Sequence, residues 1–218
     1  MMDRLETIVD MIEFETCIAD VGCDHGYVGL ELFKKNKIKK LIATDISEEC
    51  LEKSNRLFKK LPYNYEGRVG DGLKPIENAE ADAVIIAGMG GDLISKIVTD
   101  DISKTKSIKK FIIQPMTEPE KVRETFYKIG FKRTRDLIVK EKKHFYFIIE
   151  FTNDGGDEPD DFVYTKLLRV HPLFESYITH EINKRMAIVE QIKKNSSAEN
   201  ASLKKLQTEI EELKALVN

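Results

Sequence analysis

The first place in this sequence where chemistry is expected is a short, acidic, glycine-rich run that contains one histidine. Its residues of interest are Asp20, Gly22, Asp24, His25, Gly26 and Tyr27. Gly22 and Gly26 permit a tight turn and let a ligand approach the backbone closely at the start of a helix. Asp24 stands where the dinucleotide fingerprint Gly-x-Gly-x-x-Gly has its second glycine. A carboxylate there repels a pyrophosphate and attracts a cation, so the run favours S-adenosylmethionine, which carries a sulfonium and an ammonium group, over NAD.

Further polar or glycine residues follow later apolar runs in the same way. Asp45 comes 19 residues after Gly26, a spacing that suits a carboxylate accepting hydrogen bonds from ribose hydroxyls. Asp71 and Gly72 follow the next run and are expected to face the adenine. The predicted cofactor-binding residues are Asp20, Gly22, Asp24, Gly26, Asp45, Ile46, Asp71, Gly72, Ala87, Gly88 and Met89. A glycine-rich turn with a purely structural role is the alternative for Gly22 and Gly26.

A second glycine-rich segment, Gly88-Met89-Gly90-Gly91, follows the apolar run 83–87. Three glycines in four residues leave room for a planar base, or simply ease the turn from a strand into a helix. Gln114 and Pro115 end the next apolar run and bring an amide to the same place. The predicted substrate-binding residues are Gly90, Gly91, Gln114 and Pro115. The Asn/Asp-Pro-Pro-aromatic motif of many amino-directed nucleic-acid methyltransferases is absent here, which counts against that chemistry.

All these positions follow short apolar runs, which alternate with amphipathic stretches up to about Thr152. Strands are predicted over 17–22, 41–45, up to residue 71, 83–88 and 111–115, with helices between them and over 118–129. Ser47, followed by Glu48 and Glu49, is typical of a helix N-cap with an acidic first turn. This alternation predicts a parallel, doubly wound α/β sheet. Such sheets bind ligands at the carboxyl ends of their strands, where the strand order reverses, so the candidate residues fall at one edge.

Two strand-like runs, 135–139 and 145–151, are joined only by the charged turn Lys140-Glu141-Lys142-Lys143. Because a crossover helix has no room there, the two strands must be antiparallel neighbours. A parallel sheet finished by a β-hairpin is typical of class I methyltransferases and is absent from ordinary dinucleotide-binding domains. We therefore predict an α/β class I methyltransferase fold, with a Rossmann-like sheet, in an S-adenosylmethionine-binding domain over residues 1–152.

The rest of the chain has a different pattern. Residues 153–161 are rich in Gly, Asp and Pro, which is typical of a linker. Apolar residues then recur at steps of three and four and form a coiled-coil seam at Leu203, Leu206, Ile210, Leu213 and Val217. A polar break at 195–200 separates this seam from an upstream apolar helical face, so residues 160–218 are predicted to form a helical hairpin, a coiled-coil-like domain. Dimerisation through the last helix is the alternative, and we expect a monomer.

Composition limits the class of protein. Of 218 residues, 41% are hydrophobic and 33% are charged, which is enough apolar material for a folded core. The net charge of −3 excludes a globally basic nucleic-acid binder, yet lysines cluster locally, five of them among residues 34–40. Without an apolar run long enough for a membrane span, and without a signal-peptide pattern, a cytoplasmic location with no membrane contact is expected. The three cysteines have no metal-like spacing, and no metal is expected.

Four blocks taken together resemble one family. The blocks are Asp20–Tyr27, Gly70–Leu73, Ile86–Gly91 and Gln114–Met116. In this order they are similar to the bacterial tRNA (adenine(22)-N1)-methyltransferases, the TrmK family, over the sheet domain up to about residue 151. The resemblance extends to the C-terminal helical domain of that family. Two places differ, since Tyr27-Val28-Gly29 replaces Tyr-Leu-Pro and Ala43-Thr44-Asp45-Ile46 replaces a Gly-x-Val run. The resemblance implies S-adenosylmethionine as cofactor and tRNA as partner.

The resemblance also implies methylation of adenine N1, whose in-plane lone pair needs no base before attack. The enzyme has to take the adenine out of its stack and align N1 with the methyl group and the sulfur. Positive charge then moves onto the adenine, where a carboxylate stabilises it. The predicted catalytic residues are Asp24, His25 and Tyr27. Asp24 is the candidate for stabilising this charge, and His25 and Tyr27 are expected to contact or stack on the base; a helix-capping histidine and a core tyrosine are the alternatives. Another RNA position, a small-molecule substrate, and a cofactor-binding RNA protein without catalysis stay open as alternative functions.

Overall fold

The protein is represented by a computed structural model that describes residues 3–156, 160–195 and 201–217. Contacts divide the chain into two compact units, Met1–Leu168 and Arg169–Asn218. The predicted linker and the predicted polar break at 195–200 therefore lie partly outside the described residues. Within the described ranges, no helix is both long and apolar enough to cross a membrane.

The larger unit contains a seven-stranded sheet in the order β3-β2-β1-β4-β5-β7-β6. Its strands are β1 (Glu15–Val21), β2 (Ile38–Asp45), β3 (Asn64–Val69), β4 (Ala83–Gly90), β5 (Lys110–Thr117), β6 (Lys132–Glu141) and β7 (His144–Thr152). The first five strands pair in parallel, and β7 pairs with β5 and β6 in the antiparallel direction. This confirms the predicted parallel sheet finished by a hairpin. The strand order reverses between β1 and β4, where a ligand crevice is expected.

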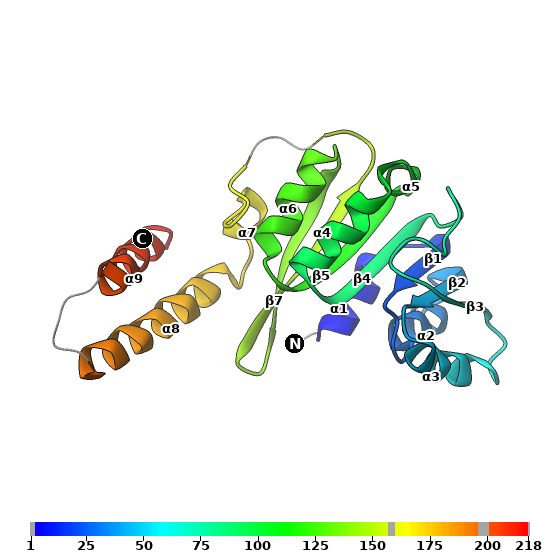
Figure 1. Cartoon of the computed structure of the whole chain (residues 1–218), viewed down its shortest axis with the longest axis horizontal. Helices are drawn as coiled ribbons and strands as arrows, with labels where there is room; N and C mark the ends of the chain where they lie inside the picture. The colour runs from blue at the N-terminus through cyan, green and yellow to red at the C-terminus, as the bar shows by residue number, and fades with distance from the viewer. Residues whose placement is uncertain (1–2, 157–159, 196–200, 218) are drawn as a thin grey trace. The chain divides into compact units, whose positions relative to one another are not determined.

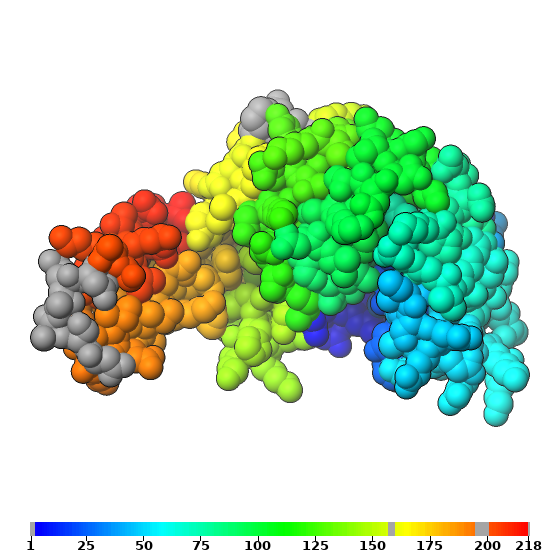
Figure 2. All heavy atoms as spheres, viewed as in Figure 1, coloured from blue at the N-terminus to red at the C-terminus, as the bar shows by residue number. Residues whose placement is uncertain are grey.

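Helices cover both faces of this sheet (Figure 1). They are α1 (Arg4–Met11), α2 (Tyr27–Lys34), α3 (Glu48–Phe58), α4 (Gly91–Asp100), α5 (Ile102–Ser107) and α6 (Pro119–Lys128), followed by the short α7 (Lys166–Arg169). Helices α4 and α6 lie on one face, where their side chains form a closed surface (Figure 2), and α1, α2 and α3 lie on the other. Ile18, Ile85 and Ile112 on the central strands are fully buried, as strands covered on both faces require. Ser47 caps α3 as predicted, because its side chain accepts a hydrogen bond from the Cys50 N–H at 3.2 Å.

Helix α1 is an element that the sequence pattern does not predict. Its N-cap is Asp3, whose side chain accepts a hydrogen bond from the Glu6 N–H at 2.8 Å. Ile8 and Val9 are buried, and the helix packs against α2 and the β6–β7 hairpin. Eight residues span about two turns, so the amphipathic pattern is too short to stand out from a charged N-terminal segment.

The segment from residue 160 to Leu168 packs on the sheet through a buried ionic network. Arg123 of α6 donates to both carboxylate oxygens of Asp136 on β6, at 2.8 and 3.0 Å, and both side chains are almost fully buried. The Thr165 hydroxyl also donates to Asp136 at 3.0 Å, and Arg123 donates to the Phe162 carbonyl at 2.9 Å. The larger compact unit therefore extends beyond the end that the sequence predicts for the first domain. The predicted division into domains 1–152 and 160–218 stays a prediction.

The smaller unit contains α8 (Phe174–Asn195) and α9 (Ala201–Ala215). Its apolar contacts are made by buried Val189, Leu203 and Ile210 and by partly buried Ile182, Ile192 and Leu206. Arg185 of α8 also donates to Glu209 of α9 at 3.0 Å. The seam residues thus pack within one chain, in agreement with the predicted helical hairpin.

The buried pair predicts a large loss of stability when its charge balance is broken. Asp136→Asn leaves the Arg123 guanidinium buried without a counter-charge, so the free energy of unfolding should fall by about 3–5 kcal/mol. Glu124→Gln on the same helix breaks an exposed pair with Lys128 (2.8 Å) and should cost at most about 1 kcal/mol. Urea unfolding of the two full-length variants measures both effects. Equal unfolding midpoints would contradict the structural role of Asp136.

Candidate active site

The turn after β1 has the backbone conformation that its glycines predict. Gly22 and Gly26 have φ angles of +75° and +73°, in the left-handed region where a side chain is strained. The N–H groups of Gly22 and Cys23 both donate to the Thr44 carbonyl on β2, at 2.7 and 3.1 Å. A Cβ atom on Gly26 would also lie 2.5 Å from the Ser54 hydroxyl oxygen. The two glycines therefore shape the turn and its packing, whatever ligand the turn meets.

Asp20 lies on β1, two residues before this turn, and is only 4% exposed. Its carboxylate has no hydrogen-bond or ion-pair partner among the described residues. Burial raises the pKa of Asp20 to about 7, and the negative charge of Asp45 at the end of β2 adds to the rise. A cationic group of a ligand would stabilise the Asp20 carboxylate in its charged form.

A pocket of about 140 Å³ opens at the carboxyl ends of β1, β2 and β4. Its lining residues are Val21, Gly22, Asp45, Ile46, Gly70, Asp71, Gly72, Met89, Leu93 and Ile97. The structure thus brings together the predicted cofactor residues Gly22, Asp45, Ile46, Asp71, Gly72 and Met89. Ile46 is 71% exposed here, and an exposed apolar side chain at the mouth of a pocket suits contact with a planar ring.

Sequence reasoning missed the apolar wall of this pocket, which consists of Leu93 and Ile97 on α4. The two residues are one helical turn apart and share a face. The same spacing is typical of a face that packs on the sheet, so periodicity alone does not separate the two roles. Leu93 is 46% exposed, and this exposure is the observation that distinguishes the wall from the core.

Asp45 links two of the loops that form the pocket. Its Oδ1 accepts a hydrogen bond from the Ser47 N–H at 2.8 Å, and its main-chain carbonyl accepts one from the Gly70 N–H at 2.9 Å. These bonds hold the carboxylate at the end of β2. An ionised carboxylate has about four acceptor positions, so Asp45 retains capacity for hydroxyl donors of a ligand.

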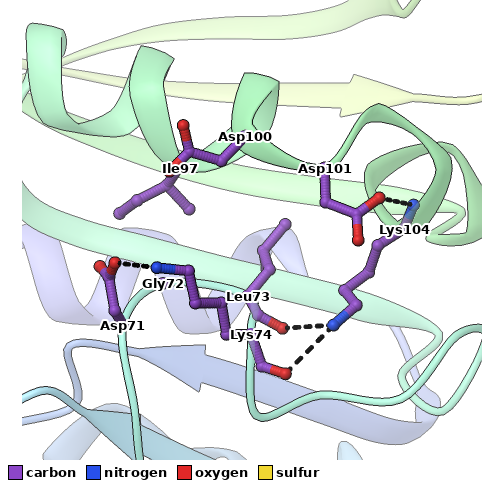
Figure 3. A pocket seen from close by; sticks show the side chains of 8 residues that line it. All are labelled: Asp71, Gly72, Leu73, Lys74, Ile97, Asp100, Asp101 and Lys104. Atoms are coloured by element: carbon purple, nitrogen blue, oxygen red, sulfur yellow. Dashed lines mark hydrogen bonds and ion pairs between the residues drawn. The ribbon is translucent and has the colours of Figure 1, made fainter.

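The loop after β3 is held by lysines, as Figure 3 shows. Lys104 of α5 donates to the carbonyls of Leu73 and Lys74, at 3.2 and 3.1 Å. Lys74 in turn donates to Asp71 at 2.6 Å, which lowers the pKa of that carboxyl. The hollow between these residues measures about 30 Å³, which is room for one or two water molecules only. A cofactor-sized ligand therefore meets this loop from the larger pocket, which Asp71 and Gly72 also line.

The strand predicted over 83–88 extends further, into the glycine-rich segment 88–91, which therefore contains no loop. β4 continues to Gly90, with an irregular register against β5 around Gly88 (φ +79°), and α4 begins at Gly91. The strand continues because β5 also continues and provides pairing partners. A Cβ atom on Gly91 would lie 2.5 Å from the Glu118 carbonyl oxygen. Close packing of two backbones therefore requires glycine at that position.

Gln114 is 2% exposed, and its amide is used within the protein. Oε1 accepts a hydrogen bond from the Gly88 N–H at 3.2 Å, and Nε2 donates to the Pro115 carbonyl at 2.9 Å. Ala87 pairs with Gln114 across the two strands, and Pro115 is buried as well. Gln114 and Pro115 thus support the backbone at Gly88. Their contact with a substrate, like that of Gly90, stays a prediction.

The three predicted catalytic residues lie together on the surface, outside the residues that line the pocket. Asp24, with a φ of +41°, pairs with Lys53 of α3 at 2.9 Å. His25 Nε2 lies 3.5 Å from Asp24 Oδ2, and the rings of His25 and Tyr27 stack with centroids 5.3 Å apart. Tyr27 is 54% exposed and the N-cap of α2 is Gly26, so a core tyrosine and a capping histidine do not describe this pair. A carboxylate beside exposed rings suits a planar, cationic ligand.

Comparison with known proteins decides the family. Residues 1–149 match the model of a family described as a methyltransferase domain. The chain belongs to this methyltransferase family. It is 29% identical to the tRNA (adenine(22)-N(1))-methyltransferase of Bacillus subtilis (strain 168), over 99% of this chain and 96% of that protein. The crystal structure of the B. subtilis m1A22 tRNA methyltransferase TrmK has a TM-score of 0.81 to this structure at 28% identity, covering 100% of this chain and 99% of that one.

A further solved structure is M. capricolum TrmK in complex with the cofactor product S-adenosylhomocysteine. Its TM-score is 0.82 at 24% identity, with 99% of this chain and 96% of that chain covered. At this identity the likeness supports the fold. Together with the B. subtilis relative, these matches confirm the resemblance to the TrmK family that the four sequence blocks indicate. The matches cover nearly the whole chain, so the similarity includes the helical unit.

The raised pKa of Asp20 predicts a stability that depends on pH. A carboxyl that titrates near 7 in the folded protein and at about 4 when unfolded binds its proton more tightly in the folded state. The free energy of unfolding therefore falls as the pH rises from about 4 to about 7. Asp20→Asn removes this titration, so its stability relative to the wild type should rise over the same range, by up to about 4 kcal/mol.

Urea unfolding of the ligand-free proteins between about pH 4.5 and about pH 8 measures this difference. Asp92→Asn, at an exposed carboxylate of α4, is the control and should keep the wild-type pH dependence. Parallel stability profiles for the wild type and Asp20→Asn would contradict the raised pKa.

Proposed function

We propose that this protein methylates N1 of the adenine at position 22 of tRNA, with S-adenosylmethionine as the methyl donor. The observation that carries the proposal is the full-length similarity to the B. subtilis tRNA (adenine(22)-N(1))-methyltransferase, which covers 99% of this chain. Because the similarity includes both compact units, the helical unit is part of the proposal and contributes to tRNA binding by shape. The proposal includes action as a monomer in the cytoplasm, where tRNA is found.

Residues at the strand ends would hold S-adenosylmethionine, which supplies an electrophilic methyl group on its sulfonium. Asp45 offers acceptor capacity for the ribose hydroxyls. Ile46 and the wall of Leu93 and Ile97 offer apolar surface to the adenine ring. Asp20, buried and without a partner among the described residues, offers the negative charge that a cationic group of the donor needs. These features fit a cationic donor better than a dinucleotide with a pyrophosphate.

The target adenine has to leave its stack before its N1 can reach this edge of the sheet. The stacked rings of His25 and Tyr27 offer a surface on which a splayed base can lie. N1 has a lone pair in the ring plane, so attack requires no prior loss of a proton. Alignment of N1 with the methyl group then supplies much of the acceleration, up to roughly 7–11 kcal/mol. As the new bond forms, the adenine gains the positive charge that the sulfur loses, and Asp24 stabilises it.

Asp24 can stabilise the adenine only if its carboxylate can exchange its ion pair with Lys53 for one with the substrate. The two side chains are about half exposed, 42% for Lys53 and 53% for Asp24. An exposed pair of this kind contributes about 1 kcal/mol or less. An adenine that becomes cationic can therefore replace Lys53 as the partner of Asp24 at small cost.

Mass-spectrometric mapping of unmodified tRNA after incubation with the protein and S-adenosylmethionine tests the proposal. The expected product is 1-methyladenosine at position 22. Methylation at another nucleotide, or of a small molecule only, would overturn the assignment in favour of another methyltransferase on the same fold. Donor binding with no methyl transfer to any tRNA would favour a cofactor-binding RNA protein without catalysis.

The role of Asp45 predicts weaker cofactor binding in Asp45→Ala. A hydrogen bond to a charged group contributes about 1.5–3 kcal/mol, so the affinity for S-adenosylmethionine should fall about tenfold to hundredfold. Isothermal titration calorimetry measures this, and thermal unfolding of the same variant checks that α3 still forms without the Asp45–Ser47 bond. Asp10→Ala, at a carboxylate of α1 that pairs with Lys35, is the control. Unchanged affinity in a folded Asp45→Ala would remove the ribose contact from the proposal.

The role of Asp24 predicts slow methyl transfer in Asp24→Asn with most of the cofactor affinity retained. Asparagine tolerates the left-handed conformation of this position, so the backbone should persist. The rate should fall about tenfold or more, because two charges near a protein surface interact with between about 1 and 4 kcal/mol. Single-turnover rates on tRNA measure this loss. Lys53→Met separates the carboxylate from its ion pair and should keep the wild-type rate; a wild-type rate in Asp24→Asn would reduce Asp24 to a structural residue.

A further inference from the structure

The hairpin of β6 and β7 ends at the same edge of the sheet as the candidate site. β7 is antiparallel to both β5 and β6, so β6 runs in the direction of the parallel strands and its last residue, Glu141, lies at their carboxyl edge. The turn residues Lys142 and Lys143 and the first residue of β7, His144, lie there too. Figure 1 shows this hairpin extending past its neighbours near the start of α1, and Figure 2 shows it protruding from the sheet unit. Residues 140–144 are called the hairpin tip below.

The hairpin tip is rich in positive charge that no acid among the described residues neutralises. Lys142 and Lys143 are exposed, and neither has an ion pair or hydrogen bond with any residue that the structure describes. Lys140 lies with its Nζ 5.1 Å from the centre of the Phe145 ring. The single acid of the tip, Glu141, is already paired with Arg4 of α1 at 3.0 Å. The tip therefore offers its lysine charges to a partner outside the sheet unit.

Arg4 connects the tip to the substrate side of the candidate site. Its main-chain N–H donates to Glu141 at 2.6 Å, and its guanidinium carbon lies 4.1 Å from the centre of the Tyr146 ring. Its Nη1 also lies 3.4 Å from the Met116 sulfur. Met116 is in the strand that carries Gln114, whose amide holds the Gly88 backbone. The Arg4 side chain thus contacts the hairpin and the end of β5, the strand that carries the predicted substrate residues Gln114 and Pro115.

We infer that the hairpin tip is a phosphate-binding surface for the RNA strand that flanks the target adenine, with Lys142 and Lys143 as its contacts and Arg4 as the residue that positions it. This inference rests on the proposed function, since it names the part of the chain that binds the RNA backbone on the substrate side of the candidate site. A base that is drawn out of its stack needs its flanking backbone held, and phosphate contacts fix register without reading sequence. Lysine is suited to this because its ammonium is a compact point charge on a flexible stem.

The double variant Lys142→Gln/Lys143→Gln tests this surface in the full-length protein. Removing one lysine that binds a phosphate should lower the slope of log affinity against log salt by about 1, so removing both should lower it by nearly 2. Between about 50 and about 200 mM salt, wild-type tRNA affinity should therefore fall about tenfold more than that of the variant. The Michaelis constant for tRNA should rise, and calorimetric affinity for S-adenosylmethionine should stay at the wild-type value.

The matched control is Lys34→Gln/Lys35→Gln, which removes the same charge from two lysines at the end of α2 that pair with Glu31 and Asp10. An equal salt slope and equal tRNA affinity in the two double variants would overturn the inference, because the effect would then be one of net charge alone. Filter binding needs no turnover, so it tests the tip even if the modified nucleotide proves to be another one. Absence of any methylated tRNA with the wild type would instead overturn the proposed function.

Discussion

Parallel pairing of β1 with β2 on one side and β4 on the other is the constraint on which the site depends. The register aligns Asp20 with Ala43 and with Ile85. The chain leaves β1 and β4 toward helices on opposite faces of the sheet, so the loops after these strands diverge and leave space between them. The place of the turn at 22–26 and of the irregular strand end around Gly88 therefore follows from strand pairing. The buried strands thus determine where the loops lie, and the polar residues in these loops determine which ligand the site can bind.

Each loop of this edge is held by the next one. Thr44 accepts hydrogen bonds from the turn after β1, Asp45 accepts one from Gly70 after β3, and Gln114 accepts one from Gly88. The Asp20 side chain differs from these groups, because it is buried and has no hydrogen-bond or ion-pair partner among the residues described. A buried acid without a partner destabilises the ligand-free fold, and such local conflicts are expected at functional sites. The same acid that weakens the ligand-free protein is the one that a cationic donor would satisfy.

The sequence predicts those parts of the structure whose cause lies in local pattern. The alternation of strands and helices, the β-hairpin, and Asp45 at a strand end all follow from short-range spacing. The hairpin turn is shorter than predicted, because β6 continues to Glu141 and β7 begins at His144, which leaves only Lys142 and Lys143 between them. The buried pair of Arg123 and Asp136 cannot be predicted in this way. Its burial involves contacts with distant residues such as Thr165, which lies 29 residues beyond Asp136 and donates to it. The sequence likewise does not reveal that α4 turns an exposed leucine toward a pocket, or that the Gln114 amide is used inside the protein. Those facts depend on which face of an element meets which neighbour.

Two opposite electrostatic requirements meet at this one edge of the sheet. Under the proposed function, a cationic donor needs negative charge, which Asp20 and Asp45 would supply, whereas an RNA backbone needs positive charge, which the hairpin tip would supply. The two can coexist because Asp20 is buried, where charge interactions are strong and little screened, while Lys142 and Lys143 lie in solvent, where salt screens their charges beyond about 8 Å. Arg4 reinforces the separation, because it pairs with Glu141, the single acid of the hairpin tip. Burial of the acid and exposure of the lysines thus let one unit attract a cation at its centre and a polyanion at its rim.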